Sequence, residues 1–185
     1  MSTVVLITGV SGTGKSALAR HLTARGEHVI SLDAQPGLCR WEDPTGRPVV
    51  RPEQPDIGWL RRHHWNWRPA VLDMLIGQLR SADLDRVFVC GTAANMALLT
   101  DRFDLIFALD VDLEIMLARL RHPERGNDFG RAGASRQLLA ERFATDRAAT
   151  SRLAHVVINA TDPLTVVANA IRGYTAICQL QPVAA

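Results

Sequence analysis

The residues best suited to chemistry lie in a glycine-rich segment near the N-terminus. Residues 9–16 read GVSGTGKS, a complete G-x-x-x-x-G-K-[ST] pattern. Glycines allow successive backbone N–H groups to turn inward around an anion. Lys15 would reach the β- and γ-phosphates of a nucleotide, and the Ser16 hydroxyl would bind a bridging Mg²⁺. The pattern therefore predicts a nucleotide site formed by Gly9, Ser11, Gly12, Thr13, Gly14, Lys15, Ser16 and Ala17.

The two elements that such a site requires flank this segment. Residues 4–8 (VVLIT) form a short β-branched apolar run, which is typical of a strand buried on both faces. Residues 17–26 (ALARHLTARG) have apolar residues at helical spacing and end at a glycine. A helix here would direct its positive N-terminal end toward phosphate. Strand, loop and helix thus follow in the order that positions the loop.

A nucleotide site does not by itself specify a reaction, but the rest of the chain narrows the choice. A guanine-reading N/TKxD element needs a lysine, and Lys15 is the only lysine in the sequence. An AAA-type or helicase engine needs more chain than 185 residues. The apolar run 87–90 is followed by Gly91 and Thr92, without the acid of a hydrolytic strand end. Elimination favours a small phosphotransferase.

Composition indicates one globular domain that spans residues 1–185. The chain is 47% hydrophobic and 22% charged with a formal net charge of +2, so no overall field demands nucleic acid as a partner. Apolar runs of about six residues fall short of the roughly 20 that cross a membrane. The three cysteines lack CxxC spacing, which favours reduced thiols over disulfides or zinc. We expect a cytoplasmic protein that acts as a monomer or homodimer.

Further apolar runs alternate with helical patterns along the chain. Strands are expected at 28–32, 87–90, 105–109 and 155–159, and helices from Pro69, at 94–102, 113–120 and 135–153, and after Pro163. The proline-rich residues 34–68 are expected to form a loop. Strands that alternate with helices predict an α/β fold, in which a mostly parallel sheet is covered by helices on both faces.

Asp33 directly follows the second expected strand and is a candidate catalytic residue. Ligands of open α/β sheets bind at the carboxyl ends of the strands. Asp33 could hold Mg²⁺ through water or accept the proton of an attacking hydroxyl, and the alternative is a helix cap or turn. Asp110 also ends an apolar run, and for this residue we favour a structural role.

Two further groups of residues could contact substrates. Aromatic and basic side chains gather in residues 58–68, where tryptophans could stack on a base or sugar and arginines could hold an acidic group. Residues 117–136 carry an excess of arginine that suits a flap closing over phosphates. The alternatives are core tryptophans and solvated surface charges. The candidates are Trp59, Arg61, Arg62, Trp65 and Trp67 in the first group, and Arg119, Arg121, Arg125 and Arg131 in the second.

The GVSGTGKS loop, followed by a second strand that ends at Asp33, resembles the P-loop small kinases related to adenylate, shikimate and gluconate kinases. The resemblance implies a P-loop NTPase-type three-layer fold, with a five-stranded parallel sheet of order 2-3-1-4-5. It also implies an acceptor-binding region at about 34–70 and a lid at about 119–135. Arg119 and Arg125 would then be catalytic lid residues, and Arg121, Thr161, Asp162 and Pro163 would contact the nucleotide.

Together these features predict an ATP- and Mg²⁺-dependent kinase of a small molecule. A hydroxyl acceptor, such as a nucleoside or sugar-like metabolite, is preferred because Asp33 offers a base that a phosphate acceptor would not need. The alternatives are a nucleoside monophosphate kinase, a nucleic-acid end kinase that stacks bases on the tryptophans, and a nucleotide-gated binding protein without chemistry.

Overall fold

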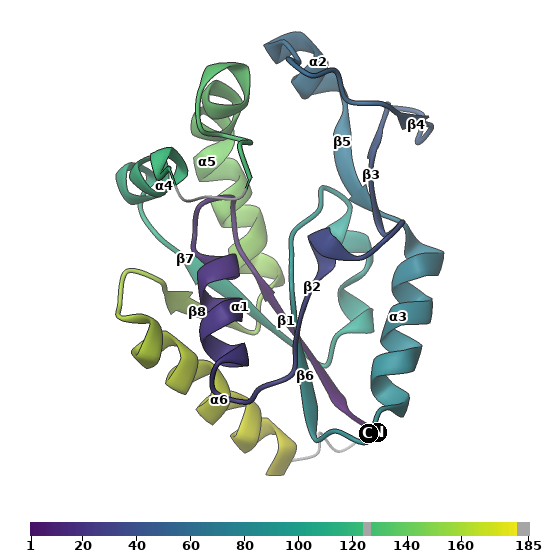
Figure 1. Ribbon diagram of the computed structural model, residues 1–185, viewed down its shortest axis with the longest axis vertical. Coiled ribbons are helices and arrows are strands. Elements are labelled where there is room, and N and C mark those ends of the chain that lie inside the picture. The colour runs from purple at the N-terminus through teal and green to yellow at the C-terminus, as the bar shows by residue number, and fades with distance from the viewer. Residues whose placement is uncertain (124–126, 181–185) are drawn as a thin grey trace.

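The computed structural model describes residues 1–123 and 127–180, and Figure 1 shows the arrangement of its elements. The strands are β1 (Thr3–Thr8), β2 (Val29–Ser31), β3 (Cys39–Glu42), β4 (Pro48–Val49), β5 (His64–Trp67), β6 (Arg86–Cys90), β7 (Leu105–Asp110) and β8 (Val156–Asn159). The helices are α1 (Lys15–Thr23), α2 (Ile57–Arg62), α3 (Pro69–Ser81), α4 (Leu113–Arg121), α5 (Gly133–Leu153) and α6 (Leu164–Leu180). Short 3₁₀ turns are η1 (Leu32–Ala34), η2 (Met96–Leu98) and η3 (Thr100–Arg102).

The large sheet is parallel and has the order β2-β6-β1-β7-β8. Numbered along the chain within this sheet, the order is 2-3-1-4-5, as expected from the resemblance to small kinases. All five carboxyl ends lie at one edge of the sheet, because neighbouring strands run in the same direction. The loop that follows β1 and the turn that follows β2 therefore open at the same edge.

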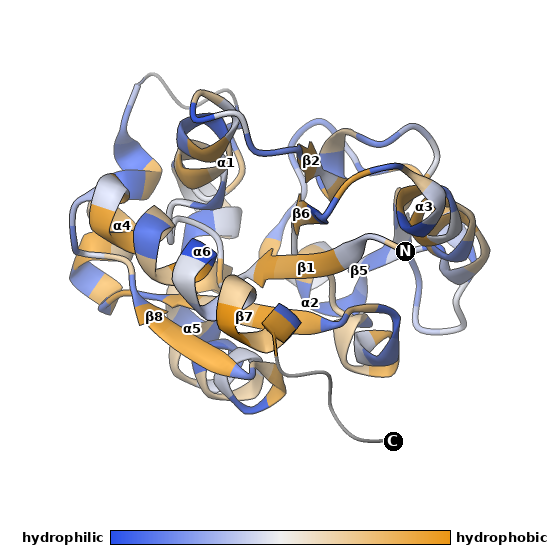
Figure 2. Ribbon diagram, turned by 90° about the horizontal axis from the view of Figure 1, so that it is seen from below, coloured by the Kyte–Doolittle hydropathy of each residue, from blue (hydrophilic) through white to orange (hydrophobic). Residues whose placement is uncertain are grey.

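Both faces of this sheet are buried, as the apolar runs predict. Successive residues of a strand point to opposite faces, so Val5 and Ile7 of β1 pack with Leu18 and Leu22 of α1 and with part of α6. Val4 and Leu6 pack on the other face with the apolar residues of α3. Figure 2 shows the strands β1, β7 and β8 as hydrophobic and the helices around them as a mixture of hydrophobic and hydrophilic residues. The structure thus confirms the three-layer α/β fold.

Residues 34–68 differ from the expected loop. They hold a second, antiparallel sheet of order β4-β3-β5 and the short helix α2. The prolines border these elements or occupy the edge strand β4, where a missing N–H removes no ladder bond. The prediction was wrong because frequent prolines limit the length of elements but do not prevent short strands from pairing.

Residues 94–102, expected to be one helix, form the two short 3₁₀ turns η2 and η3 instead. The other expected strands and helices are present with their ends shifted by at most a few residues. Among the described residues, no helix is long and apolar enough to cross a membrane.

Candidate functional site

The loop between β1 and α1 has a backbone that only glycine adopts readily. Gly9, Gly12 and Gly14 have φ angles of 143°, 89° and 106°. A Cβ atom on Gly9 would lie 2.7 Å from the carbonyl oxygen of Leu109 and 2.8 Å from Thr13 Oγ1. Glycine at these positions is therefore required by geometry, and the loop curls closely over the end of β7.

The start of α1 suits an anion. Gly14 is its N-cap residue and offers no side-chain hydrogen bond, and the first turn contains no acidic residue. Within residues 1–123 and 127–180, the backbone N–H groups of Gly12 and Gly14 donate no hydrogen bond. The Ser16 hydroxyl is exposed in the same turn, where it could bind a metal ion that rests on phosphate oxygens. These groups fit the phosphates of a nucleotide with Mg²⁺.

Lys15 lies against the loop itself. Its Nζ atom donates to the carbonyl oxygens of Gly9 at 2.6 Å and Val10 at 3.1 Å. The positive charge of Lys15 lowers the pKa of the Cys90 thiol at the end of β6. Burial has the larger, opposite effect and raises the pKa of Cys90 to about 12. Burial, together with the charge of Asp33, likewise raises the pKa of Cys39 to about 12. Both thiols stay protonated near neutral pH, so neither is an activated nucleophile.

Arg119 connects the two sides of the expected nucleotide site. It lies in α4, donates from Nη1 to the carbonyl of Thr13 at 2.9 Å, and donates from Nη2 to the carbonyl of Ala160 at 2.8 Å. The turn containing Ala160 is ordered by Asn159, whose Oδ1 accepts from the backbone and hydroxyl of Thr161. Thr161, Asp162 and Pro163 directly follow Ala160, so Arg119 connects this turn to the phosphate loop. Arg119 holds this arrangement through main-chain carbonyls rather than standing free in a lid.

The other lid candidates are placed less closely. Arg121 is exposed in the last turn of α4, and Arg125 lies outside the described residues. The expected lid range 119–135 includes the end of α4 and the start of α5. A lid role for these arginines therefore stays a prediction.

Asp33 lies in η1, immediately after β2, and its side chain is exposed. Its Oδ1 accepts from Trp65 Nε1 at 3.3 Å and from Cys39 Sγ at 3.9 Å. Strand β2 pairs with β6, and β6 pairs with β1, so Asp33 and the phosphate loop lie two strands apart at one edge. No ion pair with Asp33 is present among the described residues, which leaves its carboxylate available for a substrate or metal.

Asp110, at the end of β7, is held quite differently. Its two oxygens accept from Arg147 Nε at 2.6 Å and from Arg147 Nη2 at 2.5 Å. This bidentate pair attaches α5 to the end of β7. The contact agrees with the structural role expected for Asp110.

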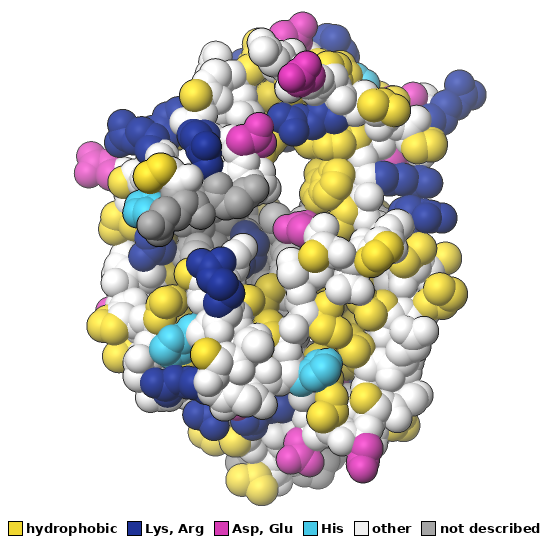
Figure 3. Space-filling view, viewed as in Figure 1, with side chains coloured by type: hydrophobic (Ala, Val, Ile, Leu, Met, Phe, Trp, Pro, Cys, Tyr) yellow, Lys and Arg dark blue, Asp and Glu magenta, His cyan; other side chains and the backbone are white. Residues whose placement is uncertain are grey.

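One face of the small sheet forms an aromatic cluster. Trp41 and Trp65 are directly opposite each other on β3 and β5, with ring centroids 5.7 Å apart. Trp59 of α2 lies 5.1 Å from the Trp41 ring, and Phe129 lies 6.1 Å from it on the other side of the site. Figure 3 shows a hollow bordered by hydrophobic side chains, with the small sheet and α2 on one side and α5 on the other.

One sequence-predicted substrate contact needs correction. Trp67 has no exposed surface and packs edge-on against Phe103, so it is a core residue and its predicted substrate contact is wrong. Arg61 forms an ion pair with Glu141 of α5 at 2.7 Å, and this pair links α2 to α5. Trp59 and Trp65 remain partly exposed beside the hollow, as a substrate contact requires.

Three residues of this region were not singled out from the sequence. Trp41 and Phe129 complete the aromatic cluster, and Asn95 ties it to the large sheet. The Asn95 side chain accepts from the backbone N–H of Trp67 at 3.0 Å and donates to its carbonyl at 2.7 Å. Alternation in CRWE and HWNW is the signal that could have placed Trp41 and Trp65 on one face.

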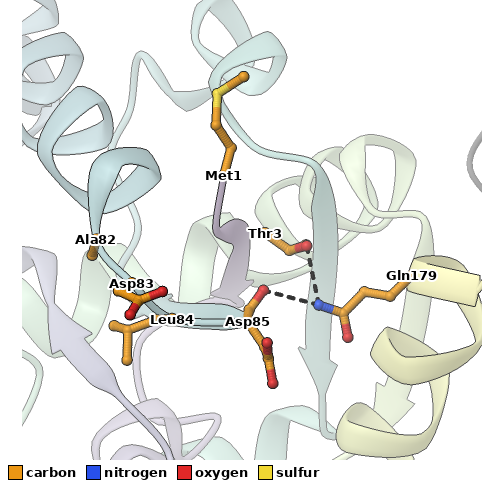
Figure 4. A pocket seen from close by; sticks show the side chains of 7 residues that line it. All are labelled: Met1, Thr3, Ala82, Asp83, Leu84, Asp85 and Gln179. Carbon is orange, nitrogen blue, oxygen red and sulfur yellow. Dashed lines mark hydrogen bonds between the residues drawn. The ribbon is translucent and has the colours of Figure 1, made fainter.

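A cavity of about 550 Å³ lies elsewhere, at the amino ends of the strands. Met1, Thr3, Asp85 and Gln179 are among its lining residues, and Gln179 Nε2 donates to Thr3 Oγ1 and to the carbonyl of Asp85 (Figure 4). It is remote from the phosphate loop, at the edge opposite to the one where such sheets bind ligands. No group of three or more metal-ligating side chains occurs in the described part of the chain.

With this geometry in place, comparisons with known proteins identify the class. Residues 5–132 match the family described as AAA domain, and the chain belongs to this family. A comparison with curated protein sequences finds no match.

Solved structures of similar fold include several kinases. TT1252 from Thermus thermophilus is 19% identical with a TM-score of 0.60, covering 95% of this chain and 97% of its own. A gluconokinase from Sinorhizobium meliloti is 18% identical with a TM-score of 0.55, covering 95% and 93%. The shikimate kinase of Acinetobacter baumannii, solved with shikimate, is 16% identical with a TM-score of 0.53, covering 100% and 97%. At these identities the likeness establishes the fold.

Proposed function

We propose that this protein is an ATP- and Mg²⁺-dependent phosphotransferase that acts on a hydroxyl group of a small molecule, such as a nucleoside or a sugar-like metabolite. The observation that carries the proposal is the pairing of two features at one sheet edge. A phosphate loop shaped by glycines with positive φ follows β1, and an exposed carboxylate that has no ion pair with any described residue follows β2. The fold similarity to a gluconokinase and a shikimate kinase supports the same reading.

The transfer itself needs few covalent events. The acceptor oxygen forms a bond to the γ-phosphorus, the bond from the γ-phosphorus to the β–γ bridging oxygen breaks, and ADP leaves. The hydroxyl proton passes to Asp33, which later returns it to solvent. The amides of the loop and Lys15 stabilise the negative charge on the β- and γ-phosphate oxygens. Mg²⁺, when bound, would neutralise charge on the same oxygens, with Ser16 and Asp33 as the residues placed to hold it.

Lys15 must change partner when a nucleotide binds. Its Nζ donates to the Gly9 and Val10 carbonyls, and phosphate oxygens would replace these weaker acceptors with charged ones. Arg119 keeps the loop and the turn at 159–163 together, which favours a nucleotide whose base lies near Thr161. Arg121 and Arg125 would approach the phosphates from the lid and exclude water.

A product assay tests the proposal directly. The protein is incubated with ATP, Mg²⁺ and separate pools of nucleosides, sugars, nucleoside monophosphates and short oligonucleotides, and phosphorylated products are detected by mass spectrometry. We expect ADP formation that depends on a hydroxyl pool. Transfer only to monophosphates, or only to oligonucleotide ends, would replace the proposal with one of those kinases. Nucleotide binding without any product would indicate a nucleotide-gated binding protein.

A further inference from the structure

The aromatic cluster restricts what the acceptor can be. We call the set Trp41, Trp59, Trp65 and Phe129 the aromatic wall. Three of its members come from the small sheet and α2, and the fourth comes from the segment between α4 and α5. Trp59 is further fixed by stacking on His63, with ring centroids 4.2 Å apart. Rings held in place this way offer a preorganised apolar surface.

The wall continues the apolar face of the small sheet beyond the core. The inner end of that face, Cys39 and Trp67, packs against the core residues Leu32 and Leu38, and Trp67 is fully buried. The outer end, Trp41 and Trp65, is only partly buried. The outer end of this face therefore presents aromatic rings that the protein covers only in part. Trp65 also joins the wall to Asp33 through its Nε1 hydrogen bond.

Three of the cations around the wall, Arg40, Arg61 and Arg68, donate to protein acceptors. Arg40 is on the opposite face of the sheet with Glu42 at 2.6 Å, and Arg61 is paired with Glu141. The guanidinium of Arg51 lies 5.8 Å from the Phe129 ring centroid, and its buried Nε has no hydrogen-bond partner among the described residues. Arg68 donates to the carbonyl of Gly37.

Two carboxylates near the wall, Glu42 and Asp33, differ in their partners. Glu42 accepts from Asn66 and Arg40 on the outer face, so it is neutralised there. Asp33 is the carboxylate that shares the hollow side with the wall, and it has no ion-pair partner among the described residues. An anionic acceptor would approach Asp33 at a cost, because like charges repel in a site partly shielded from water.

We infer that the phosphate acceptor is an uncharged alcohol with a flat or ring-shaped face, which lies on the aromatic wall with its hydroxyl directed to Asp33. The inference rests on the proposed kinase function and names its substrate class. Aromatic side chains bind bases and sugar rings through their faces, and this contact needs no charge on the ligand. The acceptor class therefore differs from the acid that the name of the gluconokinase states and from the shikimate bound in the shikimate kinase.

Calorimetric titration tests the inference with ligands matched in ring and different in charge. The full chain is saturated with a non-hydrolysable ATP analogue and Mg²⁺, so that the phosphate groups of the test ligands cannot bind in the loop. Each of four nucleosides is compared with its 5′-monophosphate, and glucose and inositol are compared with glucuronate and inositol phosphate. We expect at least one uncharged member to bind about tenfold or more tightly than its charged counterpart. Tighter binding of the anionic members, or no binding by any uncharged member, would overturn the inference.

Variants locate the binding on the wall. Trp41→Ala should weaken binding of the uncharged ligand by about tenfold or more, since stacking on one ring contributes that much. Trp41→Phe keeps a ring and should lose no more than a few-fold, which guards against an effect of misfolding. Arg40→Gln changes the neighbouring residue on the opposite face and should leave the affinity unchanged. Equal affinities for all four proteins would place the ligand away from the wall.

Binding and transfer are measured separately, so the two proposals can fail independently. Uncharged ligands that bind the wall but receive no phosphoryl group would support the ligand class and contradict the kinase function. Phosphoryl transfer confined to anionic acceptors would leave the kinase function standing and overturn the acceptor class.

Discussion

The two halves of the candidate site are built in different ways. The donor half, around the loop between β1 and α1, uses main-chain N–H groups held by left-handed glycines and one lysine. The acceptor half uses large side chains that β3, β5 and α2 bring together from residues 41, 59 and 65. A site of main-chain groups leaves a short contiguous pattern in the sequence. A site of side chains exists only after the strands have paired, so it leaves none.

The largest effect should come from the donor half. Lys15→Ala removes the ammonium that stabilises the transferring phosphate, and we expect kcat to fall by about 10³-fold. The fold should persist, because the Lys15 ammonium donates to the carbonyls of Gly9 and Val10 within its own loop. Product formation and thermal unfolding of the same preparation check both points. Activity close to that of the wild type would remove the loop from the mechanism.

Asp33→Asn tests the chemical group of the acceptor half. Asparagine keeps an oxygen for the Trp65 Nε1 hydrogen bond but loses the charge and the basicity, so geometry and chemistry are separated. We expect kcat to fall by about 10²-fold with a smaller change in acceptor affinity. Steady-state kinetics on the acceptor identified by the product assay provide the measurement. A loss of less than about tenfold, roughly 1.4 kcal/mol, would reduce Asp33 to a turn residue.

The sequence predicted the donor half almost completely and the acceptor half only in part. The loop, its flanking elements and the parallel sheet follow from local patterns, and strand order followed from the resemblance carried by residues 9–16. Residues 34–68 were expected to be a loop because prolines are frequent there, and β3, β4 and β5 are only two to four residues long. The burial of Trp67 beside the exposure of Trp65 depends on where the small sheet meets η2, which no local pattern encodes.

Alanine substitutions at two glycines test how strongly each half of the site depends on its backbone conformation. Gly9→Ala combines a positive φ with a close approach to Leu109 and Thr13, so the loop must shift. Gly46 of the turn between β3 and β4 also has a positive φ, 81°, but a Cβ atom there meets nothing within 4 Å. We expect Gly9→Ala to weaken nucleotide binding by about tenfold or more. Gly46→Ala should cost about 1 kcal/mol of stability and leave nucleotide affinity unchanged.

Titration of the nucleotide analogue into both variants measures this difference. Thermal unfolding of the two proteins supplies the control, because each substitution places alanine in a left-handed conformation. Equal nucleotide affinities would mean that the loop tolerates a displacement at Gly9, and that its amides bind phosphate less directly than its geometry indicates.

The smallest effect concerns the outer face of the small sheet and depends on pH. Burial raises the pKa of Glu42, but hydrogen bonds from Asn66 and Arg40 outweigh burial and hold the pKa below its ordinary value of 4.5. A carboxyl whose pKa is lowered by folding stabilises the folded state fully above its unfolded pKa, and this contribution is lost as pH falls through the folded-state pKa.

Glu42→Gln removes this contribution, which we expect to be about 1 kcal/mol at neutral pH. Since all four tryptophans lie between residues 41 and 67, their fluorescence reports this part of the molecule, and denaturant titrations followed by it measure the local stability. The wild type should lose its advantage over Glu42→Gln as the pH is lowered from about 6 to about 3, while both proteins keep the same nucleotide affinity at neutral pH. A difference that does not change with pH would mean that Glu42 acts through packing and not through its charge, and the outer face would then support the aromatic wall by shape alone.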